Sequence, residues 1–466
     1  MRRRTGALLG LALLGLALLS TALLSTTRAH AHGRPPALRQ LAIDPDNADR
    51  WVAQATWGLA TSDDGGESWR WTCAAAYGAD PTFEDPRLAL IDGAIHLASF
   101  GGIRASPGGC DWETSLSADL ASDLVVTPDG GALALIFEGE RDRLVRYEGG
   151  GPAETLFEAP DDVLFDRVVV APSDRSEVYL SGRVPLGPMR ERQLVLLAST
   201  DAGASFLRTD IARVGEEYSL IVDAVDADDA RTVYAHALNF DGEMAPERVL
   251  RSRDGGASFE AVLGVPQVGG LLSLSGGRVF VGSRLGGLWL SNDGGNTFAR
   301  IADESVQCLT RRGDALLVCT DQALDGFALG QLALANAARG EIVPLLRLDE
   351  IRDPAVCPRC SATGITCPGW LPDIVQDLAI APEAFGLTEA DLPGEAGTGA
   401  PREPVVPAEC GGPLAASGRS GCASAEEAPS APLMGALGLL LLQARRRRRK
   451  TRPSAKSGAK AAAPAA

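Results

Sequence analysis

The chain has 466 residues, of which 45% are hydrophobic, so it can bury a large core and is neither disordered nor fibrous. Its 53 Gly and 29 Pro residues favour many turns and short strands, and with only four His residues a histidine-built zinc or catalytic centre is disfavoured. The formal net charge of −16 repels phosphate backbones, so we expect no nucleic-acid partner.

The first predicted element is an export signal. Residues 2–4 are Arg, residues 6–24 are nearly all Leu, Ala and Gly, and Ala29-His30-Ala31 has small residues at the spacing that signal peptidase needs. The sequence therefore predicts a signal peptide over residues 1–31, removed after Ala31. Because the apolar run approaches the length that spans a bilayer, a permanent N-terminal anchor is the alternative.

The body of the chain contains a repeated turn motif, Ser-x-Asp-x-Gly-x-Ser/Thr-aromatic, with Ser106 to Trp112 as a degenerate fifth copy. The Asp carboxylate and the hydroxyl groups can bond backbone amides of a tight turn, Gly can adopt positive φ, and the aromatic returns the chain to the core. The four full copies contain Ser62, Asp64, Gly66 and Trp69; Ser199, Asp201, Gly203 and Phe206; Ser252, Asp254, Gly256 and Phe259; and Ser291, Asp293, Gly295 and Phe298.

Alternating apolar residues around the fourth copy predict strands at residues 278–282 and 287–290, so each repeat is expected to be a meander of about four short strands. The motifs resemble those of the Asp-box, or BNR-repeat, family, over residues 37–348. The resemblance implies an all-β fold, a β-propeller of four-stranded antiparallel blades. Motif spacings of 39 to 53 residues are blade-sized, and the gap between Ser106 and Ser199 holds two units. We therefore expect seven blades, with six as the alternative because the last unit lacks the motif.

The nine Cys residues include Cys422 near the C-terminus, and the other eight form an even set suited to disulfides in an oxidising compartment. Sequence position favours two pairs, Cys73 with Cys110 and Cys308 with Cys319, the latter across two adjacent predicted strands. The remaining four, expected to form two further bridges, are Cys357, Cys360, Cys367 and Cys410.

The spacing of Cys357 and Cys360 is also that of redox and zinc motifs. No strand–helix–strand pattern surrounds this pair, and no second close pair follows, so an active dithiol and a zinc site are minor alternatives to structural bridging.

The C-terminal part of the chain is predicted to contain four segments. Residues 349–392 form a Cys-bearing segment that packs after the ring, and residues 393–432 form a Pro/Gly/Ala-rich, disordered stalk. An apolar run from Leu433 to Ala444 predicts a short helix, which at about 18 Å is marginal for crossing a bilayer. Residues 451–466 form a disordered basic tail.

Residues 418–450 resemble the MYXO-CTERM sorting segment of myxobacteria and relatives. Gly421-Cys422, a short spacer, the apolar run and a block of five Arg residues occur in the order typical of that family. The resemblance implies cleavage near Cys422 and delivery to the cell surface or outer envelope, after initial anchoring in the inner membrane through the apolar segment. The positive-inside rule keeps the Arg block cytoplasmic, and an ordinary C-terminal anchor is the alternative.

The sequence identifies no catalytic residue, metal ligand or cofactor site. The motif Asp residues occur in all four copies, so we interpret them as turn residues rather than catalysts. Sialidases, which carry such boxes, need an arginine triad and a Tyr–Glu pair; the nearest candidates here are Arg183-Val184-Pro185 and Glu217-Tyr218, and neither fits the family pattern. Acidic loops at residues 44–49 and 223–229 lack the full EF-hand pattern and are interpreted as solvated turns, with calcium as the alternative.

The expected function is that of an exported, surface-anchored, non-catalytic ligand-binding or scaffold module. Its expected partners are an extracellular protein or glycan, the export and sorting machinery, and the membrane through the C-terminal tag. A carbohydrate-active hydrolase of glycosidase or sialidase type, using rim carboxylates that the sequence does not identify, is the main alternative, and a purely structural envelope protein is another.

Overall fold

The computed structural model describes residues 34–160, 162–186, 192–392 and 406–410. The predicted signal peptide with Ala31, the apolar C-terminal helix, the sorting tag with Cys422, the basic tail and most of the stalk lie outside the described residues. Within the described ranges, no helix is both long and apolar enough to cross a membrane.

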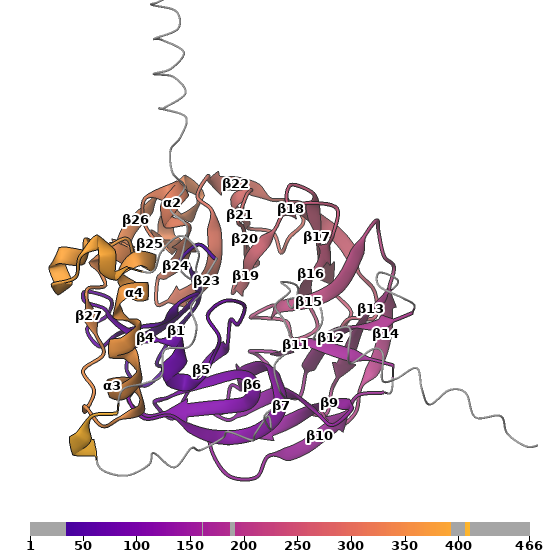
Figure 1. Ribbon diagram of the computed structural model, residues 1–466. Helices are drawn as coiled ribbons and strands as arrows, with labels where there is room; N and C mark the ends of the chain where they lie inside the picture. Colours follow the sequence, from indigo (N-terminus) through magenta and orange to yellow (C-terminus); the bar gives the residue numbers. More distant parts are fainter. Residues whose placement is uncertain (1–33, 161, 187–191, 393–405, 411–466) are drawn as a thin grey trace, which may run out of the picture. The chain divides into compact units, whose positions relative to one another are not determined.

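The strands form sheets arranged around a central axis, each with its first strand innermost, which is the architecture of a β-propeller (Figure 1). Sheet 1 contains β1 (Leu38–Ile43), β2 (Trp51–Ala55), β3 (Gly58–Ser62), β4 (Arg70–Cys73) and β27 (Asp353–Pro354). Sheet 2 contains β5 (Arg87–Ile91), β6 (Ala94–Ser106), β7 (Glu113–Val126), β8 (Ala132–Glu138), β9 (Arg141–Tyr147) and β10 (Glu154–Glu158).

The other sheets each have four antiparallel strands in chain order. Sheet 3 contains β11 (Leu164–Val170), β12 (Val178–Pro185), β13 (Arg192–Ser199) and β14 (Leu207–Ile211). Sheet 4 contains β15 (Glu217–Val225), β16 (Val233–Asn239), β17 (Pro246–Ser252) and β18 (Glu260–Pro266). Sheet 5 contains β19 (Val268–Leu274), β20 (Arg278–Ser283), β21 (Gly287–Ser291) and β22 (Ala299–Ala302). Sheet 6 contains β23 (Val306–Arg312), β24 (Ala315–Thr320), β25 (Leu329–Ala333) and β26 (Ile342–Leu346).

The expectation of seven separate blades is wrong, and the alternative of six agrees with the six sheets. The reason lies in sheet 2, which occupies the sequence of two expected repeats. Strand β6 pairs with β5 through residues 94–98 and with β7 through residues 100–105, bending where Gly101 and Gly102 adopt positive φ. Strand β7 in turn pairs with β6 through its first half and with β8 through its second half. These two long strands merge the repeats into one six-stranded sheet.

Short helices lie in the connections and in the segment after the ring. They are η1 (Ala74–Tyr77), α2 (Gln322–Asp325), η2 (Leu334–Arg339), η3 (Leu348–Glu350), α3 (Ala362–Thr366), η4 (Cys367–Trp370), α4 (Leu371–Asp377), η5 (Pro382–Phe385), η6 (Glu389–Asp391) and η7 (Ala408–Cys410).

Each of the four repeated motifs forms the turn between the third and fourth strands of a sheet. In the third copy, Ser252 Oγ accepts the amide of Gly256 at 2.8 Å, and Asp254 Oδ1 accepts the amide of Ser258 at 2.9 Å. The same pair of bonds recurs in the other copies. Each turn also bonds the loop between the first and second strands, as in the 2.9 Å bond from the Gly255 amide to the Arg231 carbonyl. The motifs therefore tie two loops together at one end of each sheet.

The ring closes where sheet 6 meets sheet 1, and in the described ranges the two sheets share no strand. Thr310 Oγ1 on β23 donates to the Leu41 carbonyl on β1 at 2.8 Å. One hydrophobic cluster contains Trp51 and Trp71 of sheet 1, Leu329 of sheet 6, and Ile374 from the segment after the ring. Contact between the first and last sheets therefore depends on packing, which this later segment completes.

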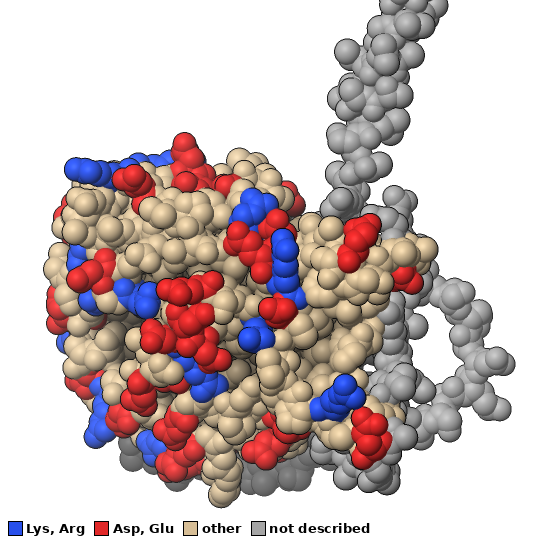
Figure 2. Space-filling view, turned by 90° about the vertical axis from the view of Figure 1, so that its left-hand side faces the viewer, with Lys and Arg blue, Asp and Glu red and all other residues tan. Residues whose placement is uncertain are grey.

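We call residues 349–392 the clasp. After β26 the chain crosses to the outer edge of sheet 1, where β27 pairs with β4 in parallel. Two disulfides then join the clasp to the start of the ring, Cys73–Cys367 and Cys110–Cys357. Figure 2 views the protein from the left-hand side of Figure 1, where the clasp lies, and shows acidic and basic side chains interspersed among uncharged surface.

All eight cysteines expected in disulfides are bridged, but only part of the expected pairing is correct. Cys308–Cys319 is confirmed, as a bridge between directly opposed residues of β23 and β24. The expected Cys73–Cys110 bridge is wrong, because the clasp brings cysteines from far along the chain against each of these two residues. Of the four late cysteines, only Cys360 and Cys410 pair with each other.

Candidate functional site

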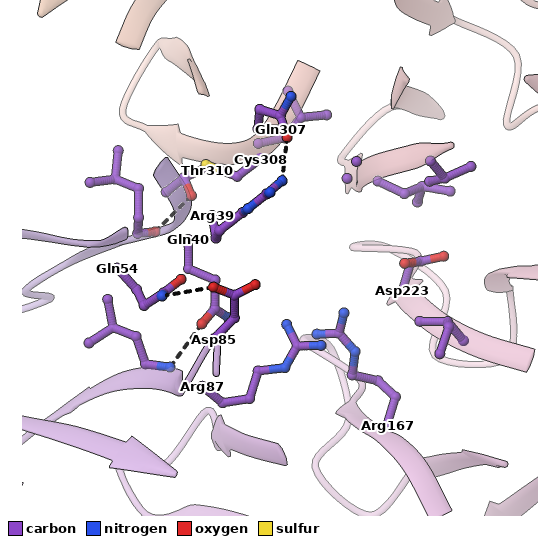
Figure 3. Close-up of a pocket in the computed structure, with 18 of the residues that line it drawn as sticks. Arg39, Gln40, Gln54, Asp85, Arg87, Arg167, Asp223, Gln307, Cys308 and Thr310 are labelled. Carbon is purple, nitrogen blue, oxygen red and sulfur yellow. Dashed lines mark hydrogen bonds between the residues drawn. The ribbon is translucent and has the colours of Figure 1, made fainter. Parts of the chain in front are cut away.

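A pocket of about 420 Å³ lies on the axis of the ring (Figure 3). All six sheets contribute to it through their first strands, and sheets 1 and 4 contribute through their second strands as well, because the innermost strands surround the axis. Its polar and charged lining residues are Arg39, Gln40, Gln54, Asp85, Arg87, Arg167, Asp223, His236, Arg284, Gln307 and Thr310.

Two guanidinium groups, of Arg87 on β5 and Arg167 on β11, point into the pocket toward each other (Figure 3). Both lie near one carboxylate oxygen of Asp123, with Nε of Arg87 at 3.6 Å and Nη1 of Arg167 at 4.0 Å. The charge of Arg167 and the burial of its own side chain lower the pKa of Arg87 to about 10, so Arg87 remains cationic at neutral pH. The single carboxylate of Asp123 is therefore shared by the guanidinium groups of Arg87 and Arg167.

Arg39 and Arg284 form the second cationic part of the pocket. Nη1 of Arg39 donates to Oε1 of Gln307 at 2.6 Å, and burial, followed by the charge of Arg284, lowers the pKa of Arg39 to about 10. Burial also lowers the pKa of Arg284. The Nε groups of Arg39, Arg167 and Arg284 are buried without a hydrogen-bond partner among the described residues. Buried donors without partners are costly, so these groups favour a ligand that accepts hydrogen bonds.

The acidic groups of the pocket are already paired. His236 Nδ1 and Asp223 Oδ2 are 2.7 Å apart, and both side chains are almost fully buried. Burial alone would lower the pKa of His236, but the charge and hydrogen bond of Asp223 raise it above its usual value. Asp85 accepts hydrogen bonds from Arg34 at 3.0 Å and from Gln54 at 3.4 Å. The pocket therefore offers more free hydrogen-bond donors than free carboxylates.

The repeated motifs lie at the opposite end of the sheets from the loops that join second to third strands. None of their Ser, Asp, Gly or aromatic residues lines the central pocket. In the part of the chain that the structure describes, no group of three or more His, Cys, Asp or Glu side chains is placed to hold a metal ion. The motif carboxylates instead accept hydrogen bonds within their own turns. In the third motif, hydrogen bonds from the hydroxyl and the amide of Ser258 lower the pKa of Asp254 to about 2.

The sialidase-like candidates are engaged in other contacts. Arg183 pairs with Asp166, and Glu217 pairs with Arg248 at 2.5 Å. The ring of Tyr218 stacks on Phe240 with centroids 4.0 Å apart. Each of the three residues Arg183, Glu217 and Tyr218 is thus engaged with a neighbouring side chain.

Sequence reasoning missed the four arginines of the pocket. They belong to no motif, and each comes from a different sheet. The available signal was a charged residue within or beside an otherwise apolar inner strand, as with Arg87 before Leu88-Ala89-Leu90 and Arg167 before Val168-Val169-Val170. Such a residue can avoid burial in the core only by facing the axis.

No protein-family model and no curated protein sequence matches the chain. Many solved structures are similar to it. The extracellular domain of a hybrid two-component system from B. thetaiotaomicron has 11% identity and a TM-score of 0.45, covering 64% of this chain and 38% of that protein. YCF48 from Cyanidioschyzon merolae has 14% identity and a TM-score of 0.41, covering 65% of this chain and 96% of that protein. The GH74 xyloglucanase from Xanthomonas campestris has 15% identity and a TM-score of 0.32, covering 64% of this chain and 63% of that enzyme.

The chain thus spans less than two thirds of the first and third of these proteins. At these identities and scores the similarity concerns the fold alone and carries no argument about function.

Proposed function

We propose that the protein is a non-catalytic binding module whose central pocket takes an anionic group of its ligand, with a carboxylate as the best fit. The observation that carries this proposal is the set of buried guanidinium Nε groups, on Arg39, Arg167 and Arg284, that have no hydrogen-bond partner in the described part of the chain. Guanidinium groups bind carboxylates through paired hydrogen bonds, and these bonds are stronger away from water. A bound carboxylate would also relieve the repulsion between Arg87 and Arg167.

Calorimetric titration with citrate tests the proposal, with its neutral triethyl ester as the control ligand. We expect the protein to bind citrate and not the ester, and R87Q/R167Q to bind citrate at least about ten-fold more weakly, because charge-assisted bonds are lost. Arg175 is exposed, paired with Asp129, and remote from this pocket, so R175Q is the matched control. Equal citrate affinity in R87Q/R167Q, or no citrate binding by the unaltered protein, would contradict the proposal.

The alternative function is glycoside hydrolysis, which usually needs two carboxylates beside the scissile bond. Asp85 and Asp223 both line the pocket, which is the observation in its favour. Each is already engaged, Asp85 by Arg34 and Asp223 by His236, which favours binding over catalysis. Incubation with a panel of polysaccharides, read by mass spectrometry, separates the two: released product that disappears in D85N and D223N variants would establish the hydrolase.

We also propose that the chain is exported and displayed at the cell surface through its C-terminal sorting segment. The four disulfides support an oxidising compartment, since such bonds persist mainly outside the cytosol. Fractionation of the native host followed by mass spectrometry of the mature ends tests this. Envelope protein that begins at residue 32 and ends near Cys422 is the expected result, whereas an uncut chain in the cytosol would refute it.

A further inference from the structure

Exposed apolar side chains lie on the loops at the mouth of the central pocket. We call six of them the collar: Phe83, Phe100, Phe240, Met244, Leu285 and Leu324, each between 40% and 70% exposed. Phe83 lies in the connection between sheets 1 and 2, and Phe100 lies within β6, beside the two glycines of positive φ. The other four lie where second strands turn into third strands, in sheets 4, 5 and 6. These positions share one end of the sheets, opposite the repeated motifs.

The collar is continuous with the arginine pocket. Leu285 directly follows Arg284, and Phe83 precedes Asp85 and Arg87 by only a few residues. A second cavity of about 240 Å³ is lined by Phe83 and Phe100 together with Asp85 and Arg87, which also line the central pocket. A ligand that reaches the guanidinium groups therefore passes the collar.

The three aromatic side chains of the collar are each held in place by a neighbouring ring. Phe83 and Phe100 pack edge to face with centroids 6.1 Å apart, and Phe240 stacks on Tyr218. Rings held in this way can bury apolar area on binding with little loss of side-chain entropy. Exposed apolar groups clustered around a pocket mark a protein-interaction surface more than a site for a freely soluble anion.

From this arrangement we propose that the partner is a protein segment that inserts an Asp or Glu side chain into the arginine pocket and packs apolar residues on both sides of it against the collar. The inference rests on the proposed function, since it uses the same guanidinium groups. An internal segment is favoured over a chain end because the collar residues come from several different sheets. Residues both before and after the carboxylate can then contact it, whereas a C-terminal carboxylate is flanked on one side only.

Selection from a library of random peptides displayed on phage, within a constrained loop, tests this with sequence as the readout. Display within a loop removes free chain ends, so only side-chain carboxylates can supply the anion. We expect the peptides retained by the unaltered protein to be enriched in an Asp or Glu flanked on both sides by apolar residues.

Three variants separate the contribution of the pocket arginines to peptide binding from that of the collar. R87Q/R167Q should lose the enrichment in acidic residues, F100S/F240S should lose the enrichment in apolar residues, and R175Q should lose neither. For a selected peptide, F100S/F240S should bind about ten-fold more weakly, the effect of losing one to two well-packed aromatic contacts. Both Phe side chains are partly exposed, so the substitutions leave the core intact.

The outcomes distinguish this inference from the proposed function. If citrate binds through Arg87 and Arg167 but no acidic–apolar peptides are enriched, the inference is wrong and the proposed function stands. Retention only of acidic polysaccharides, or only of peptides with a free C-terminal carboxylate, would likewise overturn the inference. If neither citrate nor peptides bind, both are wrong.

Discussion

Removal of the two disulfides between the clasp and the ring tests how the propeller is closed. In C73A/C367A one bridge is lost, in C110A/C357A the other, and in the quadruple variant both. Because sheets 1 and 6 share none of the described strands, we expect these bridges to contribute strongly to the free energy of unfolding.

The magnitude follows from the loops that the bridges close. While Cys110–Cys357 is present, Cys73–Cys367 closes a loop of about 47 residues, and its loss should cost about 4 kcal/mol in the chain-entropy estimate. Once the first bridge is gone, the second closes a loop of 247 residues, and its loss should cost about 5.5 kcal/mol more. The quadruple variant should thus be less stable by about 9.5 kcal/mol, a loss comparable to the whole stability of many domains.

Unfolding in guanidinium chloride, followed by tryptophan fluorescence, measures this loss of stability, since Trp71 is buried beside Cys73 in the cluster that joins the clasp to the ring. C308A/C319A is the control, because this bridge closes only 11 residues within one sheet and its loss should cost about 3 kcal/mol. A quadruple variant no less stable than C308A/C319A would refute the view that the clasp closes the ring.

Three further predictions concern single residues. The ion pair of His236 with Asp223 raises the pKa of the imidazole, so the stability contributed by this pair should be complete below pH 6.5 and lost as the pH rises through the raised value. The unfolding free energy measured against pH should show this loss, and the H236Q variant should not show it. D254A should lose about 1–2 kcal/mol in denaturant unfolding, because the turn loses several hydrogen bonds; an unchanged midpoint would contradict this. In G256A the new Cβ would lie 2.2 Å from a leucine side chain, so the variant should lose about 2 kcal/mol of unfolding free energy. G276A is the control, because Gly276 has a similar positive φ but open space around it, and its loss should be clearly smaller. Equal losses in the two variants would show that only the backbone conformation determines the effect.

The repeat motifs made the propeller predictable from the sequence. Each motif joins short apolar strands, and strands expected at residues 278–282 and 287–290 correspond to β20 and β21. The number of sheets was not predictable in this way, because nothing in the sequence of residues 94–126 indicates that β6 and β7 run continuously and merge two repeats. Local patterns define strands, whereas sheet boundaries depend on pairing between them.

The disulfides and the pocket depended on contacts remote in sequence. Nearness along the chain favoured Cys73–Cys110, but ring closure brings Cys73 against Cys367. Likewise Arg87 and Arg167 meet only because a ring places every inner strand beside the axis. No spacing rule relates such residues, so they become visible only in three dimensions.

The position of the clasp also sets an order of events during synthesis. The tryptophans of sheet 1 are among the first core residues to be made, yet the partner of Cys73 is 294 residues further along the chain. At about 5–20 residues per second, a nascent chain waits roughly 15–60 s before that partner exists. Throughout this interval the outer edge of sheet 1 is uncovered. Sheet 1 is therefore the first sheet to be synthesised and the last to receive its covering strand and disulfide.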